Sequence, residues 1–220
     1  MAKYFDVQQG EQEWLDARAG IPTTSEFANL VTPAWKVRTA KDIETYLHKK
    51  LAERMGYTVS VFFSGPMEQG SILEDTARPW YAFAHNRDVA ACGFFTTDDG
   101  SAGCSPDGIF GPPEDIAECG GIEIKCPQPH AHFGYLLANE VPAKYRAQVQ
   151  GAMYVTGAKK WTFVSYLGDG FVNGKTVPVP KLVLTVPRDE VAMSALGEAL
   201  AAFNKRLDAG FEQLNVGKWS

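Results

Sequence analysis

The chain has 220 residues, of which 45% are hydrophobic and 21% charged, a composition typical of a folded protein and not of a disordered one. Its 21 basic and 26 acidic residues give a net charge of −5, which argues against a protein that coats nucleic acid through a general basic excess. No apolar run reaches the roughly 18 residues of a membrane span, and the N-terminus lacks the pattern of a signal peptide. We therefore expect a cytoplasmic protein without membrane contact, folded as a single domain over residues 1–220.

The first half of the chain has the patterns of helices, at residues 11–18, 23–30, 41–55 and 68–85. Thr23 and Glu26 match a capping box that would begin the second of these helices. The third has apolar residues four apart and ends at Gly56. Pro79 predicts a kink or a break in the fourth.

The second half alternates between strand and helix patterns. Strands are expected at residues 89–97, 101–104, 121–125, 161–167 and 182–186, and helices at 143–155 and 189–207. The sequence Asp98-Asp99-Gly100 between the first two strands indicates a hairpin. This order of elements predicts an α/β or α+β fold with a central sheet.

The strand at residues 121–125 carries two charged residues among apolar ones. Successive side chains of a strand point to opposite faces, so Glu123 and Lys125 share one face while Ile122 and Ile124 enter a core on the other. Taken alone, the charged pair is equally well explained as a surface ion pair.

A second acidic residue precedes this strand in the sequence Ser105-Pro106-Asp107-Gly108, which taken alone is typical of a turn. Together, Pro106-Asp107 and Glu123-x-Lys125 form the PD-(D/E)xK nuclease signature. Two carboxylates from adjacent strands can converge on one Mg²⁺, which prefers oxygen ligands. A lysine beside them can orient or deprotonate the attacking water and offset phosphate charge.

Further motifs surround this signature in a fixed order. They are Gln9-Gly10 and Trp14 with Arg18-x-Gly20-Ile21-x-Thr23-x-Ser25-Glu26, then Gly70-x-x-x-Glu74-x-x-Ala77-Arg78, Ser105-Pro106-Asp107-Gly108, Glu123-Ile124-Lys125-Cys126-Pro127, and Pro142-x-x-Tyr145-x-x-Gln148-x-Gln150-x-x-Met153-x-Val155-Thr156. With these five blocks the chain resembles the lambda-exonuclease-like, or YqaJ, viral recombinase family of DNA exonucleases. The resemblance covers nearly three quarters of the chain and ends at about Lys160.

The resemblance implies roles for the metal ligands. Asp107 and Glu123 would be the main ligands, joined by the main-chain carbonyl of Ile124. Glu74 would supply a further carboxylate that can hold a second ion, although its neighbour Asp75 leaves open a solvated acidic helix face. The implied cofactor is Mg²⁺, two ions per site, with Mn²⁺ able to substitute.

The resemblance also implies roles around the reacting water and the DNA end. Lys125 would position and activate the water, and Gln148 and Tyr145 would steady the lysine or the nucleophile. Gln150 is an alternative to Gln148, since the two lie two residues apart on one helix. Arg18 and Ser25 would bind the 5′-phosphate of the degraded strand; Ser25 is alternatively no more than part of the capping box.

The cysteines and two histidines near the motif strand could also suggest a metal site, but we do not expect them to bind one. The four cysteines lack any Cys-x-x-Cys pair and are expected to be buried, reduced thiols and not ligands of an iron–sulfur cluster. His130 and His132 follow the motif strand and are expected to face solvent.

The resemblance implies a restriction-endonuclease-like fold with a central mixed sheet flanked by helices. The implied activity is exonucleolytic hydrolysis of one strand of linear double-stranded DNA, from a 5′ end, leaving a 3′ single strand. The implied assembly is a homotrimer that works with a single-strand annealing protein. Two alternatives remain: a single-strand or structure-selective nuclease, and a catalytically silent DNA-end-binding or inhibitor protein on the same scaffold.

Overall fold

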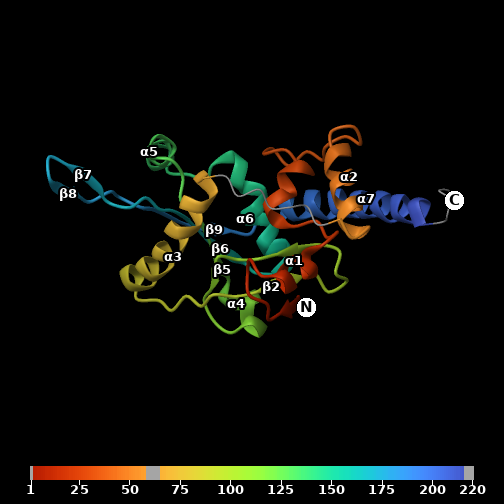
Figure 1. Ribbon diagram of the computed structural model, residues 1–220, viewed down its shortest axis with the longest axis horizontal. Helices are drawn as coiled ribbons and strands as arrows, with labels where there is room; N and C mark the ends of the chain where they lie inside the picture. The colour runs from red at the N-terminus through yellow and green to blue at the C-terminus, as the bar shows by residue number, and fades with distance from the viewer. Residues whose placement is uncertain (1, 58–64, 216–220) are drawn as a thin grey trace.

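The computed structural model describes residues 2–57 and 65–215 (Figure 1). The α-helices are α1 (Gln12–Arg18), α2 (Glu44–Arg54), α3 (Gly65–His85), α4 (Ile116–Cys119), α5 (Pro129–Ala138), α6 (Ala143–Thr156) and α7 (Glu190–Asn215), and the 3-10 helices are η1 (Thr24–Asn29) and η2 (Pro113–Asp115). The strands are β1 (Lys3–Phe5), β2 (Phe94–Thr96), β3 (Gly103–Cys104), β4 (Gly108–Ile109), β5 (Gly121–Lys125), β6 (Lys160–Ser165), β7 (Gly170–Val172), β8 (Lys175–Val177) and β9 (Leu182–Pro187).

The central sheet has the strand order β4-β5-β6-β9. Its inner pair, β5 and β6, is parallel, and both outer pairs are antiparallel. Helices α3 and α6 pack against this sheet, which confirms the predicted fold class of a mixed sheet flanked by helices. The predicted hairpin also forms, but β2 and β3 belong to a separate antiparallel sheet of order β1-β2-β3.

Strand alternation divides the core between the two faces of the central sheet. Ile122 and Ile124 are fully buried and pack with Ala77 and Tyr81 of α3. The opposite face of the neighbouring strand β6 carries Phe163, which packs in the larger cluster that includes α6. Glu123 and Lys125 therefore leave β5 on the face that α6 covers, as the sequence predicts.

The β7–β8 hairpin extends from one end of the molecule, and the C-terminal end of α7 lies at the other (Figure 1). Phe171 in the hairpin is 75% exposed, Phe83 in α3 is 91% exposed and Leu137 in α5 is 89% exposed. Large apolar side chains thus reach solvent from three elements. Among the helices of the described ranges, none has the length and apolar character to cross a membrane.

The structure differs from the sequence predictions for two of the helices. The segment after Thr23 is a 3-10 helix and not an α-helix, and the Thr23 side chain does not cap it. The Glu26 carboxylate is drawn instead to Lys49 and Lys50 of α2, at 2.5 and 3.1 Å. At Pro79 the sequence predicts a kink or a break, and helix α3 continues through this residue, so of the two the break does not occur.

The prediction that His132 faces solvent is also wrong. Its side chain is fully buried, with Nδ1 2.8 Å from Ser165 Oγ and Nε2 2.8 Å from the carbonyl oxygen of Pro180. A carbonyl can only accept, so Nε2 carries a proton and donates it. These two contacts attach α5 to the end of β6 and to the loop before β9.

Candidate active site

The pairing of β4 with β5 brings Asp107 beside the middle of the motif strand. The Asp107 amide donates to the carbonyl oxygen of Ile122 at 3.2 Å, and the Ile124 amide donates to Asp107 Oδ2 at 2.6 Å. In a strand, the N–H and C=O of one residue point to the same side, as the exchanged bonds of antiparallel pairs require. The Ile124 carbonyl therefore points to the side on which Asp107 lies.

The buried carboxylate of Glu123 forms an ion pair with Lys125. The distance from Lys125 Nζ to Glu123 Oε1 is 2.5 Å, and Glu123 is only 2% exposed. Burial raises the pKa of Glu123 to about 8, opposed by the attraction of Lys125, and Asp107 raises it further. Burial alone would lower the pKa of Lys125, but the charges of Glu123 and Asp107 raise it above its ordinary value. The lysine is thus held in its charged form.

Two more carboxylates take part in the electrostatics of this region. Burial raises the pKa of Asp107, although Lys125 and the Ile124 amide oppose the shift. Burial and the nearby charge of Asp107 raise the pKa of Glu74 to about 7. Glu74 is half-buried whereas Asp75 is exposed, so the helix presents these neighbouring acids to different surroundings. Of the two, Glu74 is the residue that interacts with the motif.

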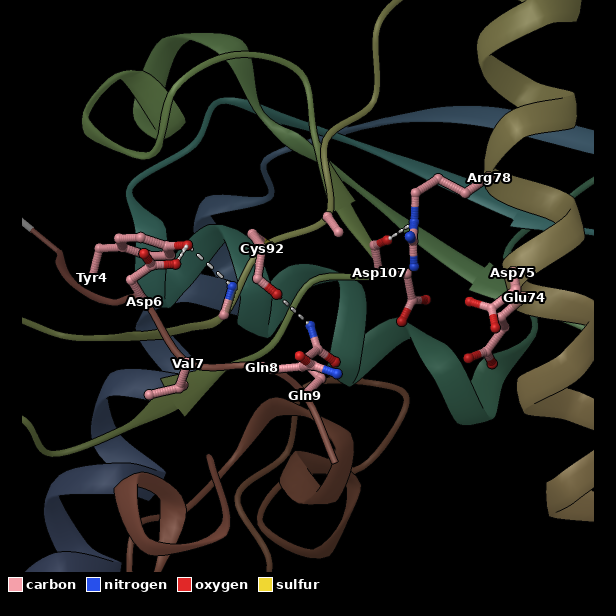
Figure 2. Close-up of a pocket in the computed structure, with 12 residues that line it drawn as sticks. Tyr4, Asp6, Val7, Gln8, Gln9, Glu74, Asp75, Arg78, Cys92 and Asp107 are labelled. Carbon is pink, nitrogen blue, oxygen red and sulfur yellow. Dashed lines mark hydrogen bonds between the residues drawn. The ribbon is translucent and has the colours of Figure 1, made fainter. Parts of the chain in front are cut away.

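A cavity of about 630 Å³ opens in front of Asp107. Figure 2 shows Glu74, Asp75 and Arg78 extending from α3 on one side of it and Gln9 approaching from the N-terminal segment on another. Because acidic side chains and a guanidinium lie on one wall, the cavity can accommodate a cation and a phosphate group together.

Gln9 and Arg78 fix the backbone that carries Asp107. Gln9 Nε2 donates to the carbonyl oxygens of Cys92 at 2.9 Å and Pro106 at 2.8 Å. Arg78 Nε donates to the Asp107 carbonyl oxygen at 2.7 Å (Figure 2). Sequence reasoning did not assign roles to these two residues, although both belong to the motif blocks and that membership was the available signal.

Tyr145 and the two glutamines of α6 separate into different environments. The Tyr145 ring centroid lies 5.5 Å from Lys125 Nζ and 5.8 Å from the Phe163 ring, so this aromatic side chain borders the lysine. Gln150 is buried elsewhere: its amide donates to the Pro187 carbonyl and accepts from the Asp189 amide. Gln148 lies three residues, or about one turn, after Tyr145 and is half-buried, which favours it over Gln150 for the site.

Arg18 and Ser25 lie together in a second part of the site. Arg18 Nη2 is 3.4 Å from Thr23 Oγ1, which is in turn 3.4 Å from Ser25 Oγ. Arg18 is half-buried, and its guanidinium carbon lies 3.9 Å from the centroid of the Trp14 ring. Burial lowers the pKa of Arg18, while the charges of Glu26 and Glu53 raise it. In the described part of the chain, no carboxylate forms an ion pair with this guanidinium, so its charge is available to an anion.

The donor atoms at the end of β5 fit a hard divalent cation. Mg²⁺ is usually held in proteins by one or two carboxylates, with water and substrate phosphates completing the octahedron. Glu123 supplies a buried carboxylate and Asp107 a half-buried one, whose charges repel, and the Ile124 carbonyl supplies a neutral oxygen. Among the described residues, no three Asp, Glu, His or Cys side chains are assembled as a metal-binding group. The donor set that fits the cation consists of these two carboxylates with the main-chain oxygen of Ile124.

The four cysteines, all within the described residues, are not grouped as ligands of a metal or an iron–sulfur cluster. All four thiols are free; Cys92 and Cys104 are buried, and Cys119 and Cys126 are half-buried. Burial raises the pKa of Cys92 and of Cys126 to about 12 in each case, so both thiols stay protonated.

Comparison of the chain with models of known protein families identifies the family to which it belongs. The YqaJ-like viral recombinase domain matches residues 13–159, which is more than half of the chain. The chain belongs to the YqaJ-like viral recombinase family. The match contains every candidate site residue predicted from the sequence, from Arg18 to Gln148, whereas Gln9 and α7 lie outside it. No functionally curated protein sequence matches the chain at a significant level.

Solved structures of similar fold agree with this family. An alkaline exonuclease from Laribacter hongkongensis, LHK-Exo, is 25% identical, with a TM-score of 0.75 over 93% of this chain and 96% of the other. Its structure in complex with dAMP gives a TM-score of 0.74 at the same identity and coverage. A phage-related exonuclease from Haemophilus somnus 129PT is 14% identical, with a TM-score of 0.65 over 89% of this chain and 96% of the other, and shows the fold alone. Together they place this YqaJ-like protein on an exonuclease fold.

Proposed function

We propose that this YqaJ-like protein is a Mg²⁺-dependent exonuclease that hydrolyses one strand of linear double-stranded DNA from its 5′ end. The observation that carries the proposal is the approach of Asp107 to the buried Glu123–Lys125 pair on β5. The similar protein from Laribacter hongkongensis is an exonuclease and has been solved with dAMP, which supports a DNA substrate.

In this proposal, the chemistry of the metal site depends on Asp107, Glu123 and the Ile124 carbonyl as ligands. Bound Mg²⁺ would polarise the phosphoryl oxygens and lower the pKa of the attacking water. Lys125 keeps its positive charge next to Glu123, which suits it to orient the water and to offset charge on the phosphate. Tyr145 borders the lysine, and Gln148, one turn later on α6, would help to steady it.

Glu74 supports the use of a second ion. Burial and, after it, the charge of Asp107 raise the pKa of Glu74, so a cation between these two carboxylates would relieve the part that comes from their repulsion. Two ions can stabilise the attacking and the leaving oxygen at once. Calorimetric titration with Mn²⁺, which we expect to substitute for Mg²⁺, should give two binding events per chain in the presence of DNA.

The 5′ polarity rests on the second part of the site. Arg18 provides a half-buried cation without a carboxylate partner among the described residues, and the hydroxyl of Ser25 lies near it through Thr23. A terminal phosphate could exchange with these contacts, since charged hydrogen bonds to phosphate are stronger than the long contacts now present. The strand that ends in this phosphate would be degraded, leaving a 3′ single strand for recombination by annealing.

The assembly we propose is a homotrimer that cooperates with a single-strand annealing protein. The support for this assembly is the resemblance to the YqaJ-like family, which implies a homotrimer. Sedimentation analysis of the purified chain would measure the number of copies.

The function is tested with linear duplex labelled separately at each end, incubated with Mg²⁺ and with a chelator. We expect release of nucleotides from the 5′-labelled end, dependent on Mg²⁺, and a remaining 3′ single strand. Release from single strands only would favour the structure-selective nuclease. Binding of DNA ends without release would favour the silent end-binding protein and overturn the proposal.

A further inference from the structure

Trp14 touches both parts of the site. Its ring face lies under the Arg18 guanidinium at 3.9 Å, and its indole N–H donates to Ser105 Oγ at 2.8 Å. Arg18 lies one turn after Trp14 on α1, whereas Ser105 is 91 residues away in the sequence. A single half-buried side chain therefore connects the end of α1 to the turn that precedes β4.

The turn that Trp14 contacts leads directly to the candidate metal ligand. Ser105 is followed by Pro106, whose ring fixes its backbone φ, and then by Asp107. Gln9 holds the Pro106 carbonyl and Arg78 holds the Asp107 carbonyl. Few backbone torsion angles between Ser105 and Asp107 are free to change. A displacement of Ser105 is therefore expected to move the Asp107 side chain as well.

The geometry points to Trp14 as a positioning residue that couples the phosphate-binding Arg18 to the metal-binding Asp107 through Ser105. This inference rests on the proposed function, because it requires both a terminal phosphate at Arg18 and a cation at Asp107. Binding of the phosphate orders the Arg18–Trp14 stack, and the ordered indole holds the Ser105 turn in the arrangement that binds the cation.

Such coupling is reciprocal. If a terminal phosphate raises the affinity for the cation by some factor, the cation raises the affinity for the phosphate-bearing end by the same factor. The consequence for the reaction is that the metal site binds most tightly when a correct DNA end is in place. A purely structural role for Trp14 would lower stability but would leave this factor unchanged.

The inference is tested by removing one contact at a time. Trp14→Phe keeps an aromatic face for Arg18 and loses the N–H, while Ser105→Ala loses the oxygen that accepts it. The double variant completes the cycle. Trp35→Phe is the matched control, because in the described part of the chain the Trp35 indole N–H has no hydrogen-bond partner, whereas its backbone N–H, which the variant keeps, donates to the Thr32 carbonyl oxygen.

The measured quantity is the affinity for Ca²⁺ of the protein bound to duplex with 5′-phosphate or 5′-hydroxyl ends, by calorimetry. Ca²⁺ takes oxygen ligands but is expected to support little hydrolysis. We expect the phosphate to raise Ca²⁺ affinity about fivefold or more in the wild type and in Trp35→Phe. Trp14→Phe, Ser105→Ala and the double variant should each reduce that factor to less than half, and by the same amount.

With Mg²⁺, Trp14→Phe should lower kcat more on 5′-phosphorylated than on 5′-hydroxyl duplex. The inference would be overturned if the 5′-phosphate raised Ca²⁺ affinity by the same factor in the wild type and in Trp14→Phe, or if it did not raise it in the wild type. Additive effects of the two substitutions in the double variant would also overturn it. If Trp14→Phe does not fold, Ser105→Ala carries the same test. A wild type that releases no nucleotides would instead overturn the proposed function, so the two failures are distinguishable.

Discussion

The two parts of the candidate site are built from different kinds of structure. Asp107, Glu123 and Lys125 lie on or beside a central β-strand, where backbone pairing and burial fix them. Arg18 and Ser25 lie at the end of a short helix and in a 3-10 helix, held by side-chain contacts of 3.4 Å. The strand region is therefore held by the sheet, whereas the region of Arg18 and Ser25 is held by weak side-chain contacts.

The two regions differ in why binding of a ligand would be favourable, a cation near β5 and a phosphate at Arg18. Burial raises the pKa values of the carboxyl groups near β5, so their ionised forms are unfavourable in the metal-free site and a cation would stabilise them. At Arg18 the cation instead lacks a strong anionic partner among the described residues, so a phosphate would replace weak contacts with strong ones. Substitutions in the first region should therefore stop the reaction, and those in the second should change which ends are used.

Asp107→Asn provides the largest expected effect. The amide keeps an oxygen for the Ile124 N–H but removes the charge, so activity should fall to background and calorimetry should show no tight Mg²⁺ binding. Asp107→Ala and Glu123→Ala should lose both properties as well. Asp115→Asn is the control, since this exposed acid of η2 does not line the cavity and should keep nearly full activity. Unchanged metal affinity in the Asp107 and Glu123 variants would contradict a shared site.

Lys125→Ala should reduce the rate by about 10²- to 10⁴-fold while DNA binding persists, because the lysine acts on the water and its removal leaves the phosphate contacts. Lys144→Ala is the matched control: Lys144 also borders the Tyr145 ring, at 4.7 Å, but is exposed. Single-turnover cleavage and duplex-binding assays would measure both variants. Near-normal turnover of Lys125→Ala would remove the lysine from the mechanism.

The strand region could be predicted from the sequence because its signal is local. Alternation of apolar and charged residues gave the bounds of β5, and it placed Glu123 and Lys125 on the face opposite Ile122 and Ile124. The resemblance and the fold class are also confirmed. The roles of the site residues stay predictions, because the structure shows their positions and not their chemistry.

The other region could be predicted only in part, because its contacts join distant segments. The capping box at Thr23 failed since Lys49 and Lys50, more than 20 residues away, attract the Glu26 carboxylate. The contacts of Gln9 with carbonyls 83 and 97 residues away have no periodic signal. Strands of two or three residues, such as β1 and β4, are too short for a pattern to indicate them.

Arg18→Ala should erase most of the preference for a 5′-phosphate over a 5′-hydroxyl end. A hydrogen bond to a charged group is worth about 1.5–3 kcal/mol, which corresponds to a tenfold to hundredfold change in rate. Residual cleavage should remain dependent on Mg²⁺. Arg206→Ala, which removes a cation that bonds to the Ala40 carbonyl, is the control. Equal degradation of both ends by the wild type would show that Arg18 does not bind the terminal phosphate.

The pH dependence should be governed by the region near β5. Metal binding requires deprotonated carboxylates, and the pKa of Glu123 is about 8. Mg²⁺ affinity should therefore rise about tenfold between pH 6 and pH 7 and level off above about pH 8.

In the metal-free protein, the stability of the fold changes with pH in the direction opposite to the Mg²⁺ affinity. The folded state binds the Glu123 proton more tightly than the unfolded state, so its free energy of unfolding should fall as the pH rises from about 5 to 8. Thermal unfolding with and without Mg²⁺ would check both trends, and the stabilisation by Mg²⁺ should be larger at pH 8 than at pH 6. The same stabilisation at both pH values would show that no raised carboxyl takes part in binding.

Ser25→Ala should have the smallest effect of these substitutions. The Ser25 hydroxyl is exposed, and its 3.4 Å distance to Thr23 Oγ1 makes it a weak contact in the absence of a phosphate. A neutral hydrogen bond contributes about 0.5–1.5 kcal/mol, so the preference for phosphorylated ends should fall about two- to tenfold. Ser194→Ala on the exposed side of α7 is the matched control. A loss as large as that of Arg18→Ala would mean that the hydroxyl, and not the guanidinium, provides most of the recognition of the DNA end.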